Sequence, residues 1–132
     1  MAKVRSRGKS SSRDKGEHKI ILLTKQPRPP ILTGHTVRIA VGCGHLYLTI
    51  NYHPDDTPFE IFAHLGKGGG CACSQLEALC RSISLGLRYG IPAEPYVKQL
   101  TSIKCPSPTN EADSCADAIA KALQGEHDDK SR

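Results

Sequence analysis

A chain of 132 residues with 38% hydrophobic and 5% aromatic residues has room for one domain with a modest, mostly aliphatic core. Its formal net charge of +5 belongs to residues 1–19, which contain seven Lys or Arg and two Asp or Glu, so the remainder is formally neutral. The longest apolar run, residues 20–23, is far too short to span a bilayer and no signal peptide is evident, so we expect a cytoplasmic protein with no membrane partner.

Residues 1–31 are predicted to be a disordered basic arm followed by a Pro-rich linker. Residues 1–18 contain almost nothing apolar that would offset the entropy of ordering them. Residues 19–24 suit a short strand or docking segment, and residues 26–30 form a stiff, extended linker. Two roles stay open for the arm: nucleic-acid binding through residues 1–19, or solubility alone.

Three segments between residues 36 and 65 alternate apolar and polar residues, which is the period of half-buried strands. They cover residues 36–41, 45–52 and 59–65, with turns at residues 42–44 and 54–58. Three short strands in succession predict an antiparallel meander.

After the glycine run at residues 66–70, the apolar period becomes helical from Ser74 onward. Gly90 ends this helix, Pro92 opens a shorter one through Leu100, and Asp113 or Ser114 caps a last helix over residues 116–123. We therefore predict an α+β domain over residues 32–124, with three helices on one face of a three-stranded sheet, and a polar tail over residues 125–132. The apolar face of the long helix carries Leu76, Leu79, Cys80, Ile83 and Leu87.

The cysteines fall at turns and helix starts, where ligands have free approach and where a helix N-terminus favours the thiolate. In a reducing compartment such cysteines are metal ligands, redox thiols or core residues more often than disulfides. Four thiolates form the usual structural zinc site, so a metal site between turns and helix N-termini is predicted, with redox-active thiols as the competing interpretation. The candidate ligands are Cys43, Cys71, Cys73, Cys105 and Cys115.

The other candidate residues are better explained by structural roles than by metal or nucleotide binding. Cys80 is expected in the core, because it lies on the apolar helix face. His45 and His64 are candidate ligands, but strand positions facing solvent explain them better. Residues 66–70 lack a phosphate-loop pattern and are interpreted as a flexible connection to Cys71, with nucleotide contact left open. Asp55 and Asp56 fit turn chemistry, and no catalytic residues are predicted.

Four motifs, G-G-C-A-C-S-Q-L-E-A-L at residues 69–79, I-S-L at residues 83–85, K-C-P-S-P at residues 104–108 and S-C-A-D-A-I-A-K-A-L at residues 114–123, resemble the TSCPD domain. That domain is found at the C-terminal end of cobalamin-dependent ribonucleotide reductases, and the resemblance covers about residues 34–124. It implies a role tied to ribonucleotide reduction. In the residue-by-residue match, Cys71, Cys105 and Cys115 fall in three of these motifs, and Cys43 falls in a further G-C-G motif at residues 42–44. These four cysteines are the preferred metal ligands, with Cys73 in reserve.

Departures from the family limit this implication. Asp113 and Ala116 replace the Thr and Pro of T-S-C-P-D, and neither the reductase barrel with its cobalamin site nor the zinc ribbon that often follows the domain is present. We therefore expect a stand-alone, zinc-binding accessory or partner-binding protein, not an enzyme by itself, whose partner is a ribonucleotide reductase or another protein in DNA synthesis.

Two alternative functions stay open. The first is a nucleic-acid-binding or regulatory protein that uses the basic arm. The second is a dithiol redox or iron–sulfur scaffold-like protein, because the cysteine layout is also similar to that of iron–sulfur scaffolds. Four thiolates accept iron or an iron–sulfur cluster as well as zinc.

Overall fold

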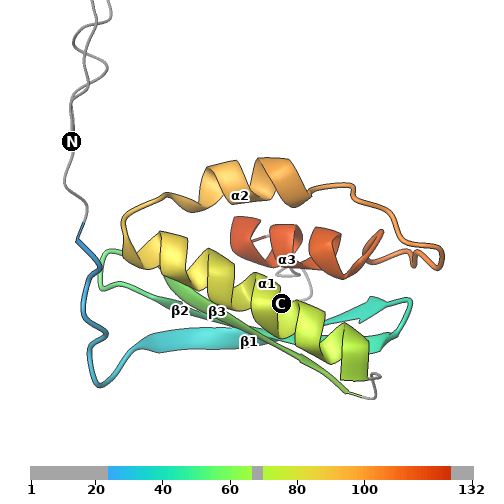
Figure 1. Cartoon of the computed structure of the whole chain (residues 1–132), viewed down its shortest axis with the longest axis horizontal. Coiled ribbons are helices and arrows are strands. Elements are labelled where there is room, and N and C mark those ends of the chain that lie inside the picture. The colour runs from blue at the N-terminus through green and yellow to red at the C-terminus, as the bar shows by residue number, and fades with distance from the viewer. Residues whose placement is uncertain (1–23, 67–69, 126–132) are drawn as a thin grey trace, which may run out of the picture.

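The computed structural model describes residues 24–66 and 70–125. The expectations for the basic arm, for the middle of the glycine run and for the polar tail therefore lie outside the described residues. The described chain confirms the predicted α+β layout, with three antiparallel strands in the order β1-β2-β3 and all three helices on one face of the sheet (Figure 1). The elements are β1 (Thr33–Val41), β2 (Gly44–Tyr52), β3 (Pro58–Leu65), α1 (Gly70–Arg88), α2 (Ala93–Leu100) and α3 (Cys115–Gln124).

The strands follow the predicted alternation, and each extends slightly beyond its predicted bounds. The central strand β2 pairs with both neighbours, and its side chains Leu46, Leu48 and Ile50 are fully buried beneath the helices. The β1–β2 turn ends at Gly44, whose φ of 130° is a conformation that residues with a side chain rarely adopt.

The long helix α1 begins at Gly70, four residues before the predicted start at Ser74. Residues 70–73 carry no helical hydrophobic period, and glycine is a poor helix former, so this first turn could not be predicted from periodicity. The predicted apolar face is confirmed: Leu76, Cys80, Ile83 and Leu87 are buried, and Leu79 packs against the core. In particular, Cys80 is 3% exposed, as its core assignment requires.

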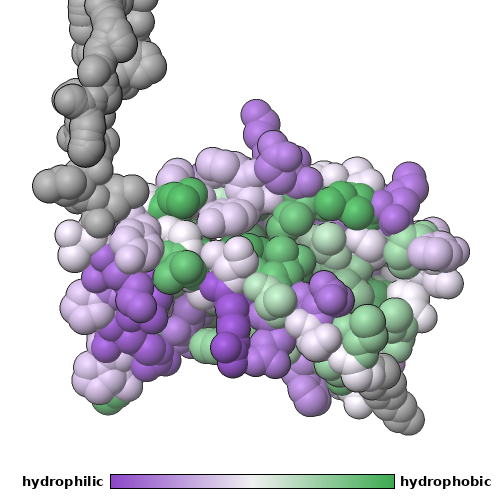
Figure 2. Space-filling model, in the orientation of Figure 1, coloured by the Kyte–Doolittle hydropathy of each residue, from purple (hydrophilic) through white to green (hydrophobic). Residues whose placement is uncertain are grey.

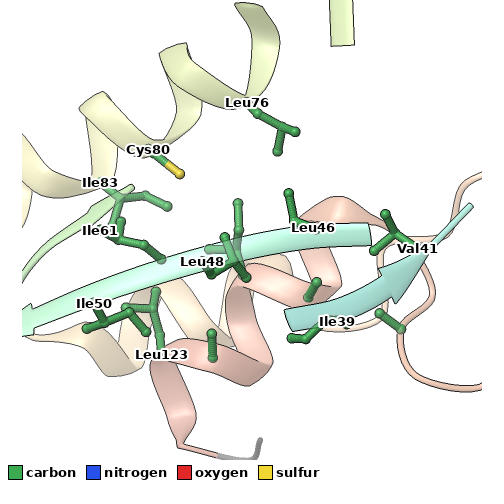
Figure 3. Close-up of a cluster of buried hydrophobic side chains, with 14 of the residues drawn as sticks. Ile39, Val41, Leu46, Leu48, Ile50, Ile61, Leu76, Cys80, Ile83 and Leu123 are labelled. Atoms are coloured by element: carbon green, nitrogen blue, oxygen red, sulfur yellow. The ribbon is translucent and has the colours of Figure 1, made fainter. Parts of the chain in front are cut away.

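The last helix, α3, begins at Cys115, one residue before the predicted bound, and Ser114 is its N-cap. The Ser114 hydroxyl accepts the N–H of Asp117 at 3.1 Å, which satisfies one free donor of the first turn. Ala118, Ile119, Ala120 and Ala122 are fully buried. Side chains of β1, β2, β3, α1 and α3 thus meet in one aliphatic cluster (Figure 3).

Candidate metal centre

The cysteine-bearing segments gather at one end of the sheet. The β1–β2 turn with Cys43, the first turn of α1 with Cys71, and the loop from α2 to α3 with Cys105 all reach the same end of the molecule (Figure 1). The labelled side chains agree, because Leu76 near the start of α1 lies over Leu46 and Val41 beside the β1–β2 turn (Figure 3). Segments far apart in the sequence therefore become neighbours here.

The loop between α2 and α3 is fastened to the end of β1. The Thr109 hydroxyl donates to the Ala40 carbonyl at 2.7 Å, and the Glu111 carboxylate accepts the Ala40 N–H at 2.7 Å. Gly42 lies directly on Ser107, so a Cβ at Gly42 would lie 2.3 Å from the Ser107 carbonyl oxygen. These contacts bring the loop that contains Cys105 against the turn that contains Cys43.

Asp117 organises the other end of this loop. Its carboxylate accepts the N–H of Ser102 at 2.8 Å and the N–H of Asp113 at 2.9 Å, and lies 3.5 Å from the Lys121 ammonium. Burial raises the pKa of Asp117, but the two N–H donors and Lys121 together outweigh burial and hold the pKa below its ordinary value. The charged carboxylate thus fixes the loop next to Cys115.

Three thiols interact electrostatically at this junction. The pKa of the half-buried Cys115 thiol is raised first by burial and then by the negative charges of Cys43 and Cys105. Cys105 Sγ also accepts the N–H of Ser107 at 3.4 Å. Thiolates that repel one another in this way are a donor set that a divalent cation would stabilise.

The cysteines on α1 are placed differently. Cys71 is exposed, and its carbonyl accepts the Ser74 hydroxyl at 3.0 Å, while Cys73 is half-buried and packs against the core. Neither of them is among the groups that raise the pKa of Cys115. Nor do three or more His, Cys, Asp or Glu side chains in residues 24–66 and 70–125 converge in a metal-binding geometry.

The donor chemistry nevertheless fits zinc. Cys43, Cys105 and Cys115 have the thiol groups that zinc prefers and come from segments that meet at this end of the sheet, and Cys71 stands on the first turn of α1, which reaches the same end (Figure 1). All six cysteines are free.

The two candidate histidines lie on strands and not on the loops and helix starts that carry the cysteines. His45 and His64 are exposed on strands, and His64 stacks obliquely across from Tyr47, with ring centroids 6.5 Å apart. Both therefore occupy the solvent-facing positions expected of them.

Sequence reasoning missed Asp117, Thr109 and Glu111, which hold the cysteine loop in place. A signal for Asp117 was present: an Asp three residues after an N-cap Ser, inside the S-C-x-D motif. Thr109 and Glu111 act on a strand about 70 residues earlier in the chain, at separations of 69 and 71 residues, and nothing in their local sequence indicates that contact.

The sequence pattern of the TSCPD domain matches residues 16–127. The chain belongs to the TSCPD domain family. Its signature now has a physical explanation, because Ser114 caps α3, Cys115 joins the thiol junction and Asp117 fixes the loop.

Curated relatives of this TSCPD domain are vitamin B12-dependent ribonucleotide reductases. That of Streptantibioticus cattleyicolor is 38% identical over 77 residues, which cover 58% of this chain and 12% of the relative. Those of Bradyrhizobium diazoefficiens (31% over 85 residues; 64% and 7%) and Agrobacterium fabrum (35% over 71 residues; 54% and 6%) are also similar. The matched region is therefore a small part of each relative.

No solved structure matches the chain. Among the helices in the described part of the chain, none is long and apolar enough to cross a membrane.

Proposed function

We propose that this TSCPD domain binds one structural zinc ion through Cys43, Cys71, Cys105 and Cys115, and serves as a non-catalytic accessory of a ribonucleotide reductase. The observation that supports the zinc site best is the meeting of two loops and a helix start, where Cys43 and Cys105 both act on the Cys115 thiol. Sulfur ligands on short connections, closed by a helix N-terminus, are typical of structural zinc.

Cys71 is the preferred fourth ligand. Positions two apart on a helix point in different directions, so Cys71 and Cys73 do not present their thiols to one place. Cys73 packs against the core, whereas Cys71 is exposed at the end of the sheet that holds the other three thiols. Cys73 remains the reserve ligand. The same geometry argues against a dithiol redox pair formed by Cys71 and Cys73.

The accessory role rests on the relatives. They are vitamin B12-dependent ribonucleotide reductases, and the matched region spans 6–12% of their length. Because the matched region is so small a part of these reductases, we infer that the domain acts by contacting a reductase chain in deoxyribonucleotide synthesis. A nucleic-acid role through residues 1–19 concerns residues outside the described part of the chain.

The zinc site is tested by elemental analysis and thiol alkylation on the purified full chain. We expect one zinc per chain, which Cys105→Ser and Cys115→Ser abolish and the matched core variant Cys80→Ala retains. Iron with acid-labile sulfide would replace the zinc proposal by a cluster, and metal-free protein with two rapidly alkylated thiols would replace it by a dithiol.

The accessory role is tested by immobilising the full chain and offering a purified cobalamin-dependent ribonucleotide reductase. Binding should persist after deletion of residues 1–18 and weaken in the zinc-free Cys115→Ser variant. Failure of the reductase to bind the zinc-loaded chain would overturn the accessory role and leave the zinc site standing.

A further inference from the structure

The outer edge of β3 is a strand edge with open hydrogen-bonding groups. β3 pairs with β2 on one side, and Ile61 shows where its other side points, because both its N–H and its carbonyl bond the Ser84 hydroxyl of α1, at 2.9 and 3.1 Å. Backbone groups alternate in direction along a strand, so Ala63 faces the same edge as Ile61. Within residues 24–66 and 70–125, no partner is found for the Ala63 N–H or carbonyl on this edge.

A groove runs along this edge between β3 and α1. It has a volume of about 610 Å³, which is within the usual range of ligand pockets. Phe62 on the strand side and Leu85 on the helix side line it, and they are 52% and 50% exposed. Figure 2 views the face that carries α1, where apolar side chains lie among charged ones. A strand edge beside a helix is a site where an extended segment adds to a sheet.

The N-terminal segment is held at one mouth of this groove. The Gln26 N–H donates to the Arg88 carbonyl at 2.9 Å, and the Arg88 guanidinium donates to the Gln26 carbonyl at 3.1 and 3.2 Å. Arg28 then forms a two-pronged ion pair with Glu60 at 3.0 and 2.9 Å. Arg28, Glu60 and Arg88 all line the groove, so the chain just before Gln26 starts beside it.

The residues before Gln26 match the groove in length and character. Residues 20–23, Ile-Ile-Leu-Leu, are the longest apolar run in the chain. In an extended conformation they lie about 10 to 20 Å from Gln26, while α1 from Arg88 back to Cys73 spans about 22 Å along the groove. An extended run that is apolar on both faces suits an edge with Phe62 on one side and Leu85 on the other. The TSCPD pattern itself starts at residue 16 and includes the run.

We propose that residues 20–23 of the same chain add to β3 as a fourth, antiparallel strand, with the Ala63 backbone as a pairing partner and Phe62 and Leu85 as flanking contacts. In the N-to-C direction, residues 20–23 run from the Cys73 end of the groove back toward Gln26, opposite to β3, which runs from Glu60 toward Leu65. This closes the exposed strand edge, which otherwise invites pairing between molecules. The proposal does not depend on the zinc site.

Amide hydrogen exchange by NMR on the full chain tests this proposal, with the Ala63 amide as the reporter. We expect Ala63 to be protected in the parent chain and to exchange at least about tenfold faster in Ile21→Asp and in Leu85→Asp. Ile31→Asp is the matched control: Ile31 is 81% exposed outside the groove, and its change should leave Ala63 protected. Circular dichroism and zinc content of each variant establish that the fold and the metal site are intact.

Two results would overturn the proposal. Ala63 exchanging equally fast in the parent chain and in Ile21→Asp would leave the edge unpaired by this segment. Protection that falls on dilution of the parent chain would assign the edge to a second copy instead.

Discussion

The two ends of the sheet are held together by different chemistry. At the end near the N-terminal segment, the buried Glu60 carboxylate, 4% exposed, accepts from Arg28 and from the Asn51 amide at 2.6 Å. Burial raises the pKa of Glu60, but these donors outweigh burial and lower the pKa. At the opposite end, burial and the charges of Cys43 and Cys105 raise the pKa of Cys115, and Cys105 Sγ accepts the N–H of Ser107.

The difference shows what each end needs. Glu60 already has its cation and its hydrogen bonds, so that end is complete within the described residues. At the thiol end, Cys43, Cys105 and Cys115 could carry negative charge together only with a cation beside them. A zinc ion would do there what Arg28 does at the other end.

Removal of zinc should have the largest effect. Cys115→Ser or a chelator is expected to lower the free energy of unfolding by about 3 kcal/mol, the stabilisation given by a ligand present at about 100 times its Kd. Urea denaturation of the parent chain with and without chelator measures the loss. A chelator that leaves the urea midpoint unchanged would show that this end needs no cation.

Glu60→Gln should have an intermediate effect, a loss of about 1–2 kcal/mol, because Gln keeps the shape but loses the charge that accepts from Arg28 and Asn51. The matched control is Glu77→Gln. Glu77 pairs with Arg81 at 2.6 Å, but both side chains are largely exposed, so its loss should stay below about 0.5 kcal/mol. Equal losses in the two variants would contradict the special role of the buried carboxylate.

Acid should weaken both ends through carboxylates. The folded pKa values of Glu60 and Asp117 lie below the unfolded values of about 4.3 and 3.9. Their contribution to stability is therefore full above those unfolded values and is lost as pH falls through the folded pKa values. Unfolding of the parent chain and of Glu60→Gln, compared from pH 6 to pH 3, should show their difference shrinking. A constant difference would mean that the Glu60 pKa is not lowered.

Ser114→Ala should cost about 1 kcal/mol, because the Asp117 N–H then loses its side-chain acceptor at the start of α3. Thermal unfolding measures the change, and zinc content should remain near one per chain. Ser82→Ala, at an exposed position on α1, is the control and should change stability by less than about 0.5 kcal/mol. Loss of zinc in Ser114→Ala would mean that the cap positions Cys115 directly.

The sequence predicted features that local periodicity determines. The alternation in β2 located its buried side chains, and the helical period placed Cys80 in the core. Residues 70–73 have no such period, so the start of α1 was placed too late. The anchoring of residues 26 and 28, and of the loop from α2 to α3, uses side chains that bond backbone or carboxylates tens of residues away. Only the folded chain shows such pairs. The ligand set remains a prediction for the zinc measurement to test.

The Ser84 hydroxyl bonds both backbone groups of Ile61 and so fixes the position of α1 along β3. Cys71 lies thirteen residues before Ser84 on the same helix, about 20 Å away along the helix axis. One residue inserted between them would turn the Cys71 thiol by about 100° around the helix axis. A chain altered in this way would keep its strands and much of its core, yet its fourth thiol would point elsewhere. The spacing between a serine and a cysteine on one helix would therefore be a requirement of the proposed metal site.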